Sequence, residues 1–228
     1  MPVLRSSIGA VLYLHGTGGS GPQGIRTARL RVPFTDAGLI FLAPSGQPGP
    51  VGDGEWSLPP ALRGGGRDEI AFLKAVLADA ADRFGLDPAR IVLAGHSRGA
   101  GLVYRVACEA PGLAIAYLPL SAGFIGPSPE RCAGPVRLLH LHGARDRAVP
   151  VAGRTAGLRI AGARESAERL AAASGCGPRP IPTDTPARLS WACPEAASVA
   201  VEILPGRHRV THRMMRRAAT WAAAQLPR

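Results

Sequence analysis

The sequence predicts an α/β fold with a mostly parallel, doubly wound sheet and helices on both faces. Short apolar runs alternate along the chain with longer segments whose apolar residues recur at helical spacing. The apolar runs are continuous, which is typical of strands that are buried on both faces. Strands that alternate with helices in this way favour a parallel sheet covered on both sides. With 228 residues, 46% of them hydrophobic, the chain can build one sizeable core, and we expect a single domain over residues 1–228.

The elements of the first quarter of the chain follow from its apolar runs and glycines. The run IGAVLYL at 8–14 indicates a buried strand, and the glycine-rich segment HGTGGSGPQG at 15–24 is expected to be a loop. A second buried strand is expected at 39–43 (LIFLA). Residues 44–66 are rich in glycine and proline, so we expect a long irregular loop of the kind that is usually functional or disordered.

The remaining elements continue the alternation. The segment at 68–84 has the apolar spacing of one helix face. Asp68 and Glu69 suit its first turn because carboxylates there offset the helix dipole, and Gly85 suits the position just past its end. Proline-rich residues 175–198 are expected to leave the sheet as an excursion and not to form a second domain. Further strands are expected at 91–94, 114–120, 136–141 and 199–204, and further helices at 99–109, 165–173 and 211–225.

The net charge of +11 raises the question of a nucleic-acid partner, which the distribution of the charges argues against. Lys74 is the only lysine, and the arginines are scattered among alanine, glycine and proline. Only 5% of the residues are aromatic, so platforms for stacking bases are scarce. We therefore interpret the densest basic group as a solvated helix face and expect no nucleic acid. Its members are Arg207, Arg209, Arg213, Arg216 and Arg217.

Membrane and metal sites leave no clear pattern in the sequence. No apolar run approaches the roughly 20 residues that span a bilayer, and the run at 8–14 lacks a small-residue cleavage site, so we interpret it as a strand and not a signal peptide. The four cysteines include no CxxC pair, which argues against a zinc knuckle or a thioredoxin-type site. They leave open two disulfides in any of three pairings or four reduced thiols. We expect no metal and no cofactor.

The sequence Gly95-His96-Ser97-Arg98-Gly99 matches the pattern G-x-S-x-G between a predicted strand and a predicted helix. Such a nucleophile elbow holds the serine in a strained tight turn above the end of a strand, and the two glycines keep that corner free of side chains. The helix that follows directs its first amides toward the charge that develops during acyl transfer. The pattern and its context therefore predict the α/β-hydrolase fold with Ser97 as the nucleophile.

A serine needs a general base that is oriented by an acid, and in this fold the chain order is Ser, Asp, His. Asp146 follows the strand predicted at 136–141, where the acid is expected. Two histidines lie further on: His208 follows the last predicted strand, and His212 lies in the first turn of the last helix. We favour His208 as the base, with His212 as the alternative.

Backbone amides of two segments are expected to form the oxyanion hole. One is the amide of Arg98, directly after the nucleophile, and the other is that of Thr17 in the glycine-rich loop, with Gly18 as the second choice. Substrate contacts are expected from His96, in the elbow, and from Trp56, in the loop at 44–66, although Trp56 could instead pin that loop to the body of the protein. We expect both 44–66 and 175–198 to be excursions near this site.

These residues resemble the poly(3-hydroxybutyrate) depolymerase and feruloyl esterase-like branch of the α/β-hydrolases over most of the chain. The resemblance implies a triad of Ser97, Asp146 and His208, a small-molecule or polymeric ester as substrate, and an extracellular or periplasmic location. The alternative location is the cytoplasm, because the chain shows no signal peptide. The motifs are LHGTGG at 14–19, Trp56 followed by RDEIAFL at 67–73, GLDPARIVLAGHSRGAGLVYRVACEAP at 85–111, LHLHGARDRAVP at 139–150, ERLAAASGC at 168–176 and LPGRH at 204–208.

The resemblance also implies the disulfides Cys108–Cys132 and Cys176–Cys193. The sequence thus predicts a serine carboxylic-ester hydrolase that works through an acyl-enzyme intermediate. An acyl-protein thioesterase or lysophospholipase-like hydrolase is the alternative within the same chemistry. A non-catalytic relative that binds a carbohydrate or a polymer is the alternative outside it.

Overall fold

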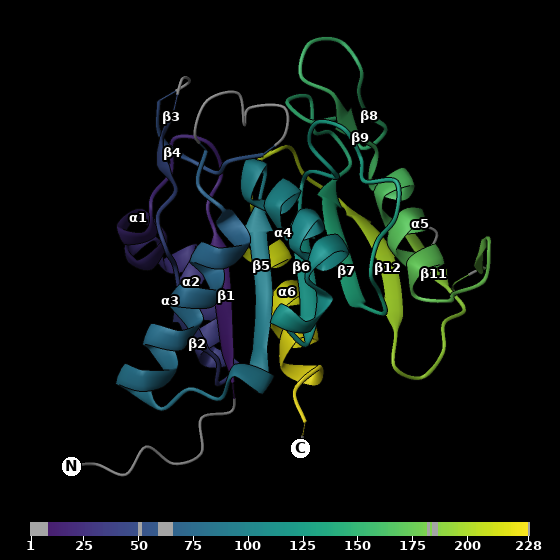
Figure 1. The fold of residues 1–228 in the computed structure, drawn as a ribbon. Helices are drawn as coiled ribbons and strands as arrows, with labels where there is room; N and C mark the ends of the chain where they lie inside the picture. The colour runs from purple at the N-terminus through teal and green to yellow at the C-terminus, as the bar shows by residue number, and fades with distance from the viewer. Residues whose placement is uncertain (1–8, 50–51, 59–65, 182, 184–186, 228) are drawn as a thin grey trace.

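The computed structural model describes residues 9–49, 52–58, 66–181, 183 and 187–227. Its centre is an eight-stranded sheet (Figure 1). The strands of this sheet are β1 (Ala10–Leu14), β2 (Ile40–Leu42), β5 (Ile91–His96), β6 (Ala116–Leu120), β7 (Arg137–Gly143), β10 (Pro180–Ile181), β11 (Arg188–Trp191) and β12 (Ser198–Leu204). They lie in the order β10-β11-β12-β7-β6-β5-β1-β2, which confirms the predicted mostly parallel sheet.

The six strands that the apolar runs predicted form the parallel part of the sheet. In β1 every residue is buried, and in β5 every residue but the last is buried, as expected for strands covered on both faces. Because the strands are parallel, β1, β5, β6, β7 and β12 end at one edge. The loops that carry the predicted site residues therefore meet there.

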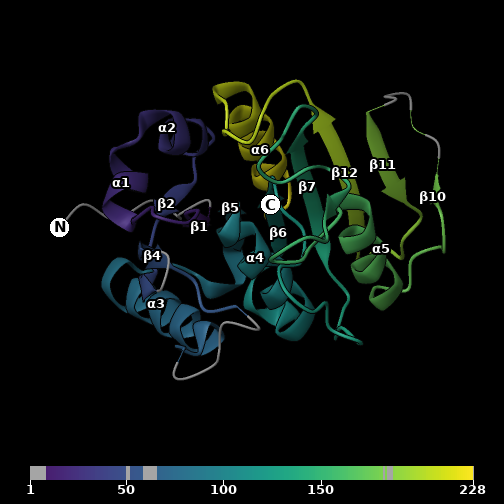
Figure 2. The ribbon, with the colours of Figure 1, turned by 90° about the horizontal axis from the view of Figure 1, so that it is seen from above.

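Helices cover both faces of the sheet, as Figure 2 shows from above. On one face, α3, α4 and α5 pack against the sheet, and on the other face α2 and α6 do so with α1 beside them. No helix in the described part of the chain is long and apolar enough to cross a membrane. The helices are α1 (Gly21–Arg26), α2 (Ala28–Asp36), α3 (Glu69–Phe84), α4 (Arg98–Glu109), α5 (Ala163–Ala173) and α6 (His212–Ala224).

The ends of α3 follow the signals in its sequence. The Asp68 side chain accepts a hydrogen bond from the Ala71 amide and caps the first turn. Gly85 ends the helix in the left-handed conformation, with φ of 63°, where an amino acid with a side chain would be strained. One face of the helix, which includes Leu73 and Leu77, is buried against the sheet.

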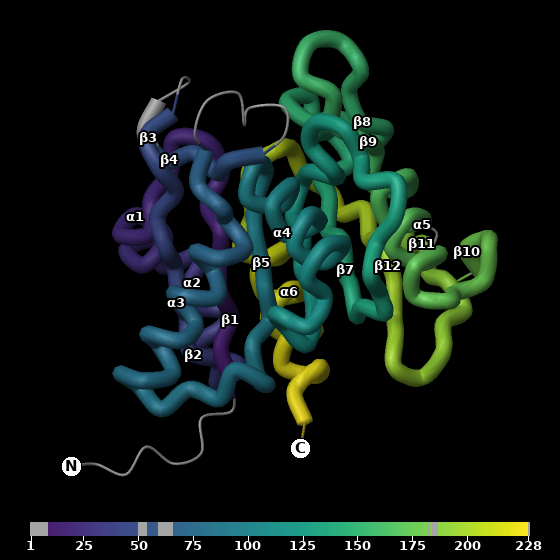
Figure 3. Tube along the Cα trace, viewed as in Figure 1, coloured from purple at the N-terminus to yellow at the C-terminus, as the bar shows by residue number. Residues whose placement is uncertain are grey.

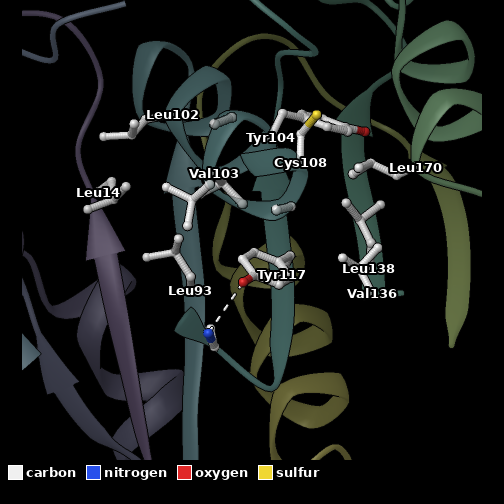
Figure 4. Close-up of a cluster of buried hydrophobic side chains, with 14 of the residues drawn as sticks. Leu14, Leu93, Leu102, Val103, Tyr104, Cys108, Tyr117, Val136, Leu138 and Leu170 are labelled. Carbon is white, nitrogen blue, oxygen red and sulfur yellow. Dashed lines mark hydrogen bonds between the residues drawn. The ribbon is translucent and has the colours of Figure 1, made fainter. Parts of the chain in front are cut away.

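The core between the sheet and α4 is built from side chains of distant segments (Figure 4). Leu14 and Leu93 come from neighbouring strands, and Val103 of α4 lies against them. Tyr117 on β6 is also fully enclosed, and its hydroxyl accepts a hydrogen bond from the Ala114 amide at 3.3 Å. This packing fixes α4, and with it the residue that precedes the helix, relative to the strand ends.

Three segments differ from the prediction. Helix α1 begins in the segment at 15–24 that was expected to be a loop. Helix α2 lies where the sequence shows no helical pattern, and it contains Pro33. The loop at 44–66 holds a small hairpin of β3 (Gln47–Gly49) and β4 (Gly52–Glu55). A second hairpin joins β8 (Gly153–Arg154) to β9 (Ile160–Ala161).

The expectation that 175–198 leaves the sheet is wrong. β11 pairs antiparallel with β12, and β10 pairs antiparallel with β11, so this segment extends the sheet at its outer edge (Figure 3). The alternation of apolar and polar residues in these short edge strands is too weak to predict them, because Trp191 is the only buried residue of β11.

The two disulfides implied by the resemblance are both present. Cys108 in α4 is joined to Cys132, and Cys176, after α5, is joined to Cys193, before β12. The bonded cysteines lie 24 and 17 residues apart, so each bond closes a loop of moderate length. Loops of this size stabilise the folded state by roughly 3 kcal/mol each in the chain-entropy account.

We predict that removing the first disulfide lowers the melting temperature without changing the fold. The double variant Cys108→Ser/Cys132→Ser should lose roughly 3 kcal/mol, or about 6–12 °C in a domain of this size. Differential scanning calorimetry measures the shift, and Ser198→Ala at an exposed position is the control. An unchanged melting temperature, or free thiols in the native oxidised protein, would contradict the prediction.

Candidate active site

The proposed nucleophile lies at a strained corner between β5 and α4. Ser97 has a φ of 55°, in the left-handed region that a residue with a side chain rarely adopts. Its two glycine neighbours leave room for the turn: a Cβ added to Gly95 would lie 2.5 Å from the Gly99 carbonyl oxygen, and one added to Gly99 would collide with the Leu14 carbonyl oxygen. The sequence motif therefore forms the tight strand-to-helix turn that it predicts.

The structure brings Ser97, His208 and Asp146 together at the carboxyl edge of the sheet. The Ser97 Oγ lies 3.0 Å from Nε2 of His208, and the other ring nitrogen, Nδ1, lies 2.8 Å from Oδ2 of Asp146. Because a carboxylate only accepts, Nδ1 carries the proton, which leaves Nε2 of neutral His208 free to accept from the serine hydroxyl. His212, the alternative base, is the exposed first residue of α6 and has no such contact.

The Asp146 carboxylate is fully buried and is held on both oxygens. Its Oδ1 accepts from the amides of Ala148 and Val149, at 3.0 and 2.8 Å. Its Oδ2, which accepts from His208, also lies 3.3 Å from Nε2 of His142. These bonds fix the orientation of the carboxylate and compensate for its removal from water.

A buried chain of hydrogen bonds runs from Asp146 into the core. Nε2 of His142 donates to the Val149 carbonyl oxygen at 2.9 Å, so Nδ1 of this neutral ring must accept. Nε2 of His140 donates to that Nδ1 at 2.9 Å, and the Tyr104 hydroxyl donates to Nδ1 of His140 at 2.8 Å. The i, i+2 spacing of the two histidines, which puts them on one face of β7, is the sequence signal for the pair.

His96 anchors the backbone of the proposed base. Its Nε2 donates to the carbonyl oxygen of His208 at 2.7 Å, and the two rings lie with centroids 4.9 Å apart. Burial lowers the pKa of His96 to about 4, so the ring is neutral near neutral pH. It also lines the cavity over Ser97, where the sequence predicts a substrate contact.

We predict that the free energy of unfolding falls as the pH drops below about 6.5. Burial lowers the pKa of His96 to about 4 and also lowers the pKa values of His140 and His142. Unfolded histidines bind protons near pH 6.5, whereas these folded ones stay neutral, so acid favours the unfolded chain. The contribution of His96 is lost between about pH 6.5 and about pH 4 and amounts to about 3 kcal/mol.

Urea unfolding at a series of pH values measures this loss. His96→Gln should make the stability less dependent on pH, because its amide can still donate to the His208 carbonyl but does not titrate. His212→Gln is the matched control, since it removes an exposed histidine. Equal pH dependence in the two variants would contradict the prediction.

The two amides predicted to form an oxyanion hole are both free of partners in the described part of the chain. The loop after β1 lies against the nucleophile, since a Cβ on Gly16 would be 3.2 Å from the Ser97 Cβ. The amides of Thr17 and Arg98 have no hydrogen-bond partner among the described residues. Arg98 is the first residue of α4, so its amide is one of the free donors at a helix start.

Trp56 does not line the cavity, which corrects the expected substrate contact. Its side chain is fully buried, and its indole N–H donates to the His15 carbonyl oxygen at 2.8 Å. The Trp56 carbonyl in turn accepts from Nε of Arg98 at 2.9 Å, and the Arg98 guanidinium pairs with Glu55 at 3.5 Å. Trp56 therefore pins the loop at 44–66 to the end of β1 and the start of α4, which is the structural alternative that the sequence left open.

A cavity of about 430 Å³ opens over the triad. It extends from Ser97 and His208 past the loop at 15–19 to side chains of β1, α1 and α2. None of the described residues of 175–198 lines it, because β10 and β11 lie at the far edge of the sheet, beyond β12. Helices α1 and α2, which the sequence did not reveal, form one wall of the cavity.

Neither a protein-family model nor a curated protein matches this sequence. Solved structures match the fold. A Bacillus cereus carboxylesterase aligns at 18% identity over 97% of this chain and 91% of its own, with a TM-score of 0.63. Esterase PE8 aligns at 22% identity over 96% and 94%, with a TM-score of 0.64, and an Aspergillus awamori acetyl xylan esterase at 14% over 91% and 86%, with a TM-score of 0.59. The chain has the α/β-hydrolase fold that its elbow motif predicts.

Proposed function

We propose that this protein is a serine hydrolase of carboxylic esters. The observation that carries the proposal is the continuous hydrogen-bonded line from Asp146 through His208 to Ser97, at 2.8 and 3.0 Å, with the serine in a strained turn over a cavity. That geometry suits proton transfer from the hydroxyl to the imidazole. The esterases among the solved structures of the same fold support the same reaction class.

In the proposed reaction, Nε2 of His208 takes the proton from Ser97 as Oγ attacks the ester carbonyl carbon. The Thr17 and Arg98 amides bind the oxygen that becomes negative. The Asp146 carboxylate stabilises the imidazolium, which then protonates the leaving alcohol. Water, deprotonated by His208, attacks the acyl-enzyme and releases the carboxylic acid and the free serine.

A fluorophosphonate probe and a p-nitrophenyl ester test the proposal. The wild-type protein should hydrolyse p-nitrophenyl acetate, and the probe should modify Ser97 alone, as peptide mass spectrometry would show. Prior labelling should abolish the hydrolysis. A protein that is folded by circular dichroism but neither turns over the ester nor reacts with the probe would favour a non-catalytic relative of this fold.

For the natural substrate we propose hydroxyalkanoate or feruloyl esters, on the strength of the sequence resemblance. The alternative hypothesis is an acyl-protein thioesterase or lysophospholipase-like hydrolase. The disulfide-bonded segment around Cys176 and Cys193 argues against it. The two disulfides also favour export to an oxidising compartment. Comparing kcat/KM for hydroxybutyrate oligomers, feruloyl esters, lysophospholipids and acyl thioesters separates these substrates.

A further inference from the structure

The cavity beside Ser97 has a polar end that the proposed reaction does not use. Tyr13 of β1, Arg29 of α2 and Arg209, which follows His208, all line it. Both arginines are exposed, and neither side chain has an ion pair or hydrogen bond among the described residues. No aspartate or glutamate of the described chain lines the cavity. Its walls therefore carry uncompensated positive charge.

The Tyr13 side chain is the second sign of a ligand. Only 2% of the residue is exposed, and its ring packs against Phe41 with centroids 5.5 Å apart. Its hydroxyl makes no hydrogen bond to the described residues, and it is not one of their enclosed unpaired polar atoms, so it is open to the cavity and available to a ligand. Burial raises the pKa of this hydroxyl and the charge of Arg29 acts in the opposite sense, so the hydroxyl is a neutral donor close to that arginine.

Three further arginines are sequence neighbours of triad residues and carry charge of the same sign. Arg145 and Arg147 flank Asp146 in sequence, and Arg207 precedes His208. All three are exposed, and none of their side chains is paired within the described part of the chain. An excess of positive charge near a site attracts ligands of the opposite charge and raises their rate of encounter.

Building on the proposed ester hydrolysis, we propose that the substrate is an ester that also bears a carboxylate, which the Tyr13 hydroxyl and the Arg29 and Arg209 guanidinium groups bind while Ser97 attacks the ester carbonyl. A carboxylate offers acceptors only, so it would satisfy the free hydroxyl and both free cations. The cavity, at about 430 Å³, accommodates a small acid of this kind beside the reacting ester.

The test compares carboxylate-bearing esters with neutral ones of matched shape. One pair is mono-p-nitrophenyl succinate and its methyl ester, with the charge on the acyl part, and the other is 4-acetoxybenzoate and 4-acetoxybenzamide, with the charge on the alcohol part. In at least one pair, kcat/KM should be about tenfold or more higher for the anion, as expected for charge-assisted hydrogen bonds. Added NaCl should reduce this ratio.

Variants locate the effect. Arg29→Gln and Arg209→Gln should each lower the anionic-to-neutral ratio about tenfold, and Tyr13→Phe should lower it severalfold. Arg216→Gln, which removes an exposed arginine of α6 outside this cavity, should leave the ratio unchanged. Circular dichroism and melting temperature establish that each variant is folded.

Two results would overturn the inference while leaving the proposed hydrolase intact. One is hydrolysis of neutral esters as fast as that of their anionic partners. The other is an anionic preference that falls as much in Arg216→Gln as in Arg29→Gln, which would assign it to the net charge of the protein. If no ester of either pair is hydrolysed and the fluorophosphonate does not react, the proposed function fails, and this inference fails with it.

Discussion

Ser97→Ala should lower kcat for a p-nitrophenyl ester by roughly 10⁶-fold, because a triad that acts as a unit fails when its nucleophile is removed. The reaction then has no covalent intermediate, and only binding and the oxyanion amides remain to assist water. The substitution removes one oxygen and keeps a Cβ at the strained φ of 55°, so the fold should persist. Steady-state kinetics measure the loss, and circular dichroism and a melting curve monitor the fold.

Ser198→Ala is the matched control for this variant. Ser198 is an exposed serine at the start of β12, at the opposite end of the strands from the triad. It should keep full activity and full labelling by the fluorophosphonate, whereas Ser97→Ala should not be labelled. Hydrolysis by Ser97→Ala at a rate near that of the wild type would contradict the proposed serine mechanism.

The positions of the site residues could be predicted because each lies where a parallel strand ends. The apolar runs before Ser97, Asp146 and His208 indicate strands β5, β7 and β12, and parallel strands place their ends at one edge. The expected chain order of Ser, Asp and His then leaves few residues that could fill each catalytic role. His208 could be preferred over His212 because it follows the strand directly.

The walls of the site could not be predicted in the same way. Helices α1 and α2 bury few residues, namely Gly21, Gly24, Pro33 and Phe34, so they show no apolar period. The role of Trp56 depends on a contact with His15, 41 residues away, which local pattern cannot reveal. Sequence thus locates the chemistry through strand ends, whereas the shape of the substrate site depends on tertiary contacts.

Asp146→Asn should lower kcat by roughly 10⁴-fold, because it places the proton on the wrong nitrogen of His208. The asparagine oxygen can replace Oδ1 and accept from the amides of Ala148 and Val149. Its NH₂ group then faces Nδ1 of His208 at the position of Oδ2 and must donate. Nδ1 becomes an acceptor, Nε2 takes the proton, and His208 can no longer accept from Ser97.

The backbone amides of Ala148 and Val149 make the alternative orientation of the asparagine unfavourable. Turning the side chain over would place its NH₂ against the Ala148 and Val149 amides and leave two donors, that of Val149 buried, without an acceptor. In the favoured orientation the NH₂ also meets the N–H of His142, which lies 3.3 Å from Oδ2 in the wild type, so the variant should lose some stability as well. Asp68→Asn is the control, because asparagine caps a helix about as well as aspartate and the charge change is the same.

Kinetics and nitrogen chemical shifts together decide what the carboxylate does. We expect kcat to fall while KM changes little, and ¹⁵N resonances of His208 to report a proton on Nε2 in the variant and on Nδ1 in the wild type. A variant with the proton on Nε2 and near-normal kcat would contradict the proposed role of His208 as base. A variant that retains both the Nδ1 proton and its activity would mean that the bond from His96 to the His208 carbonyl, at 2.7 Å, suffices to orient the ring, and that Asp146 serves the fold more than the reaction.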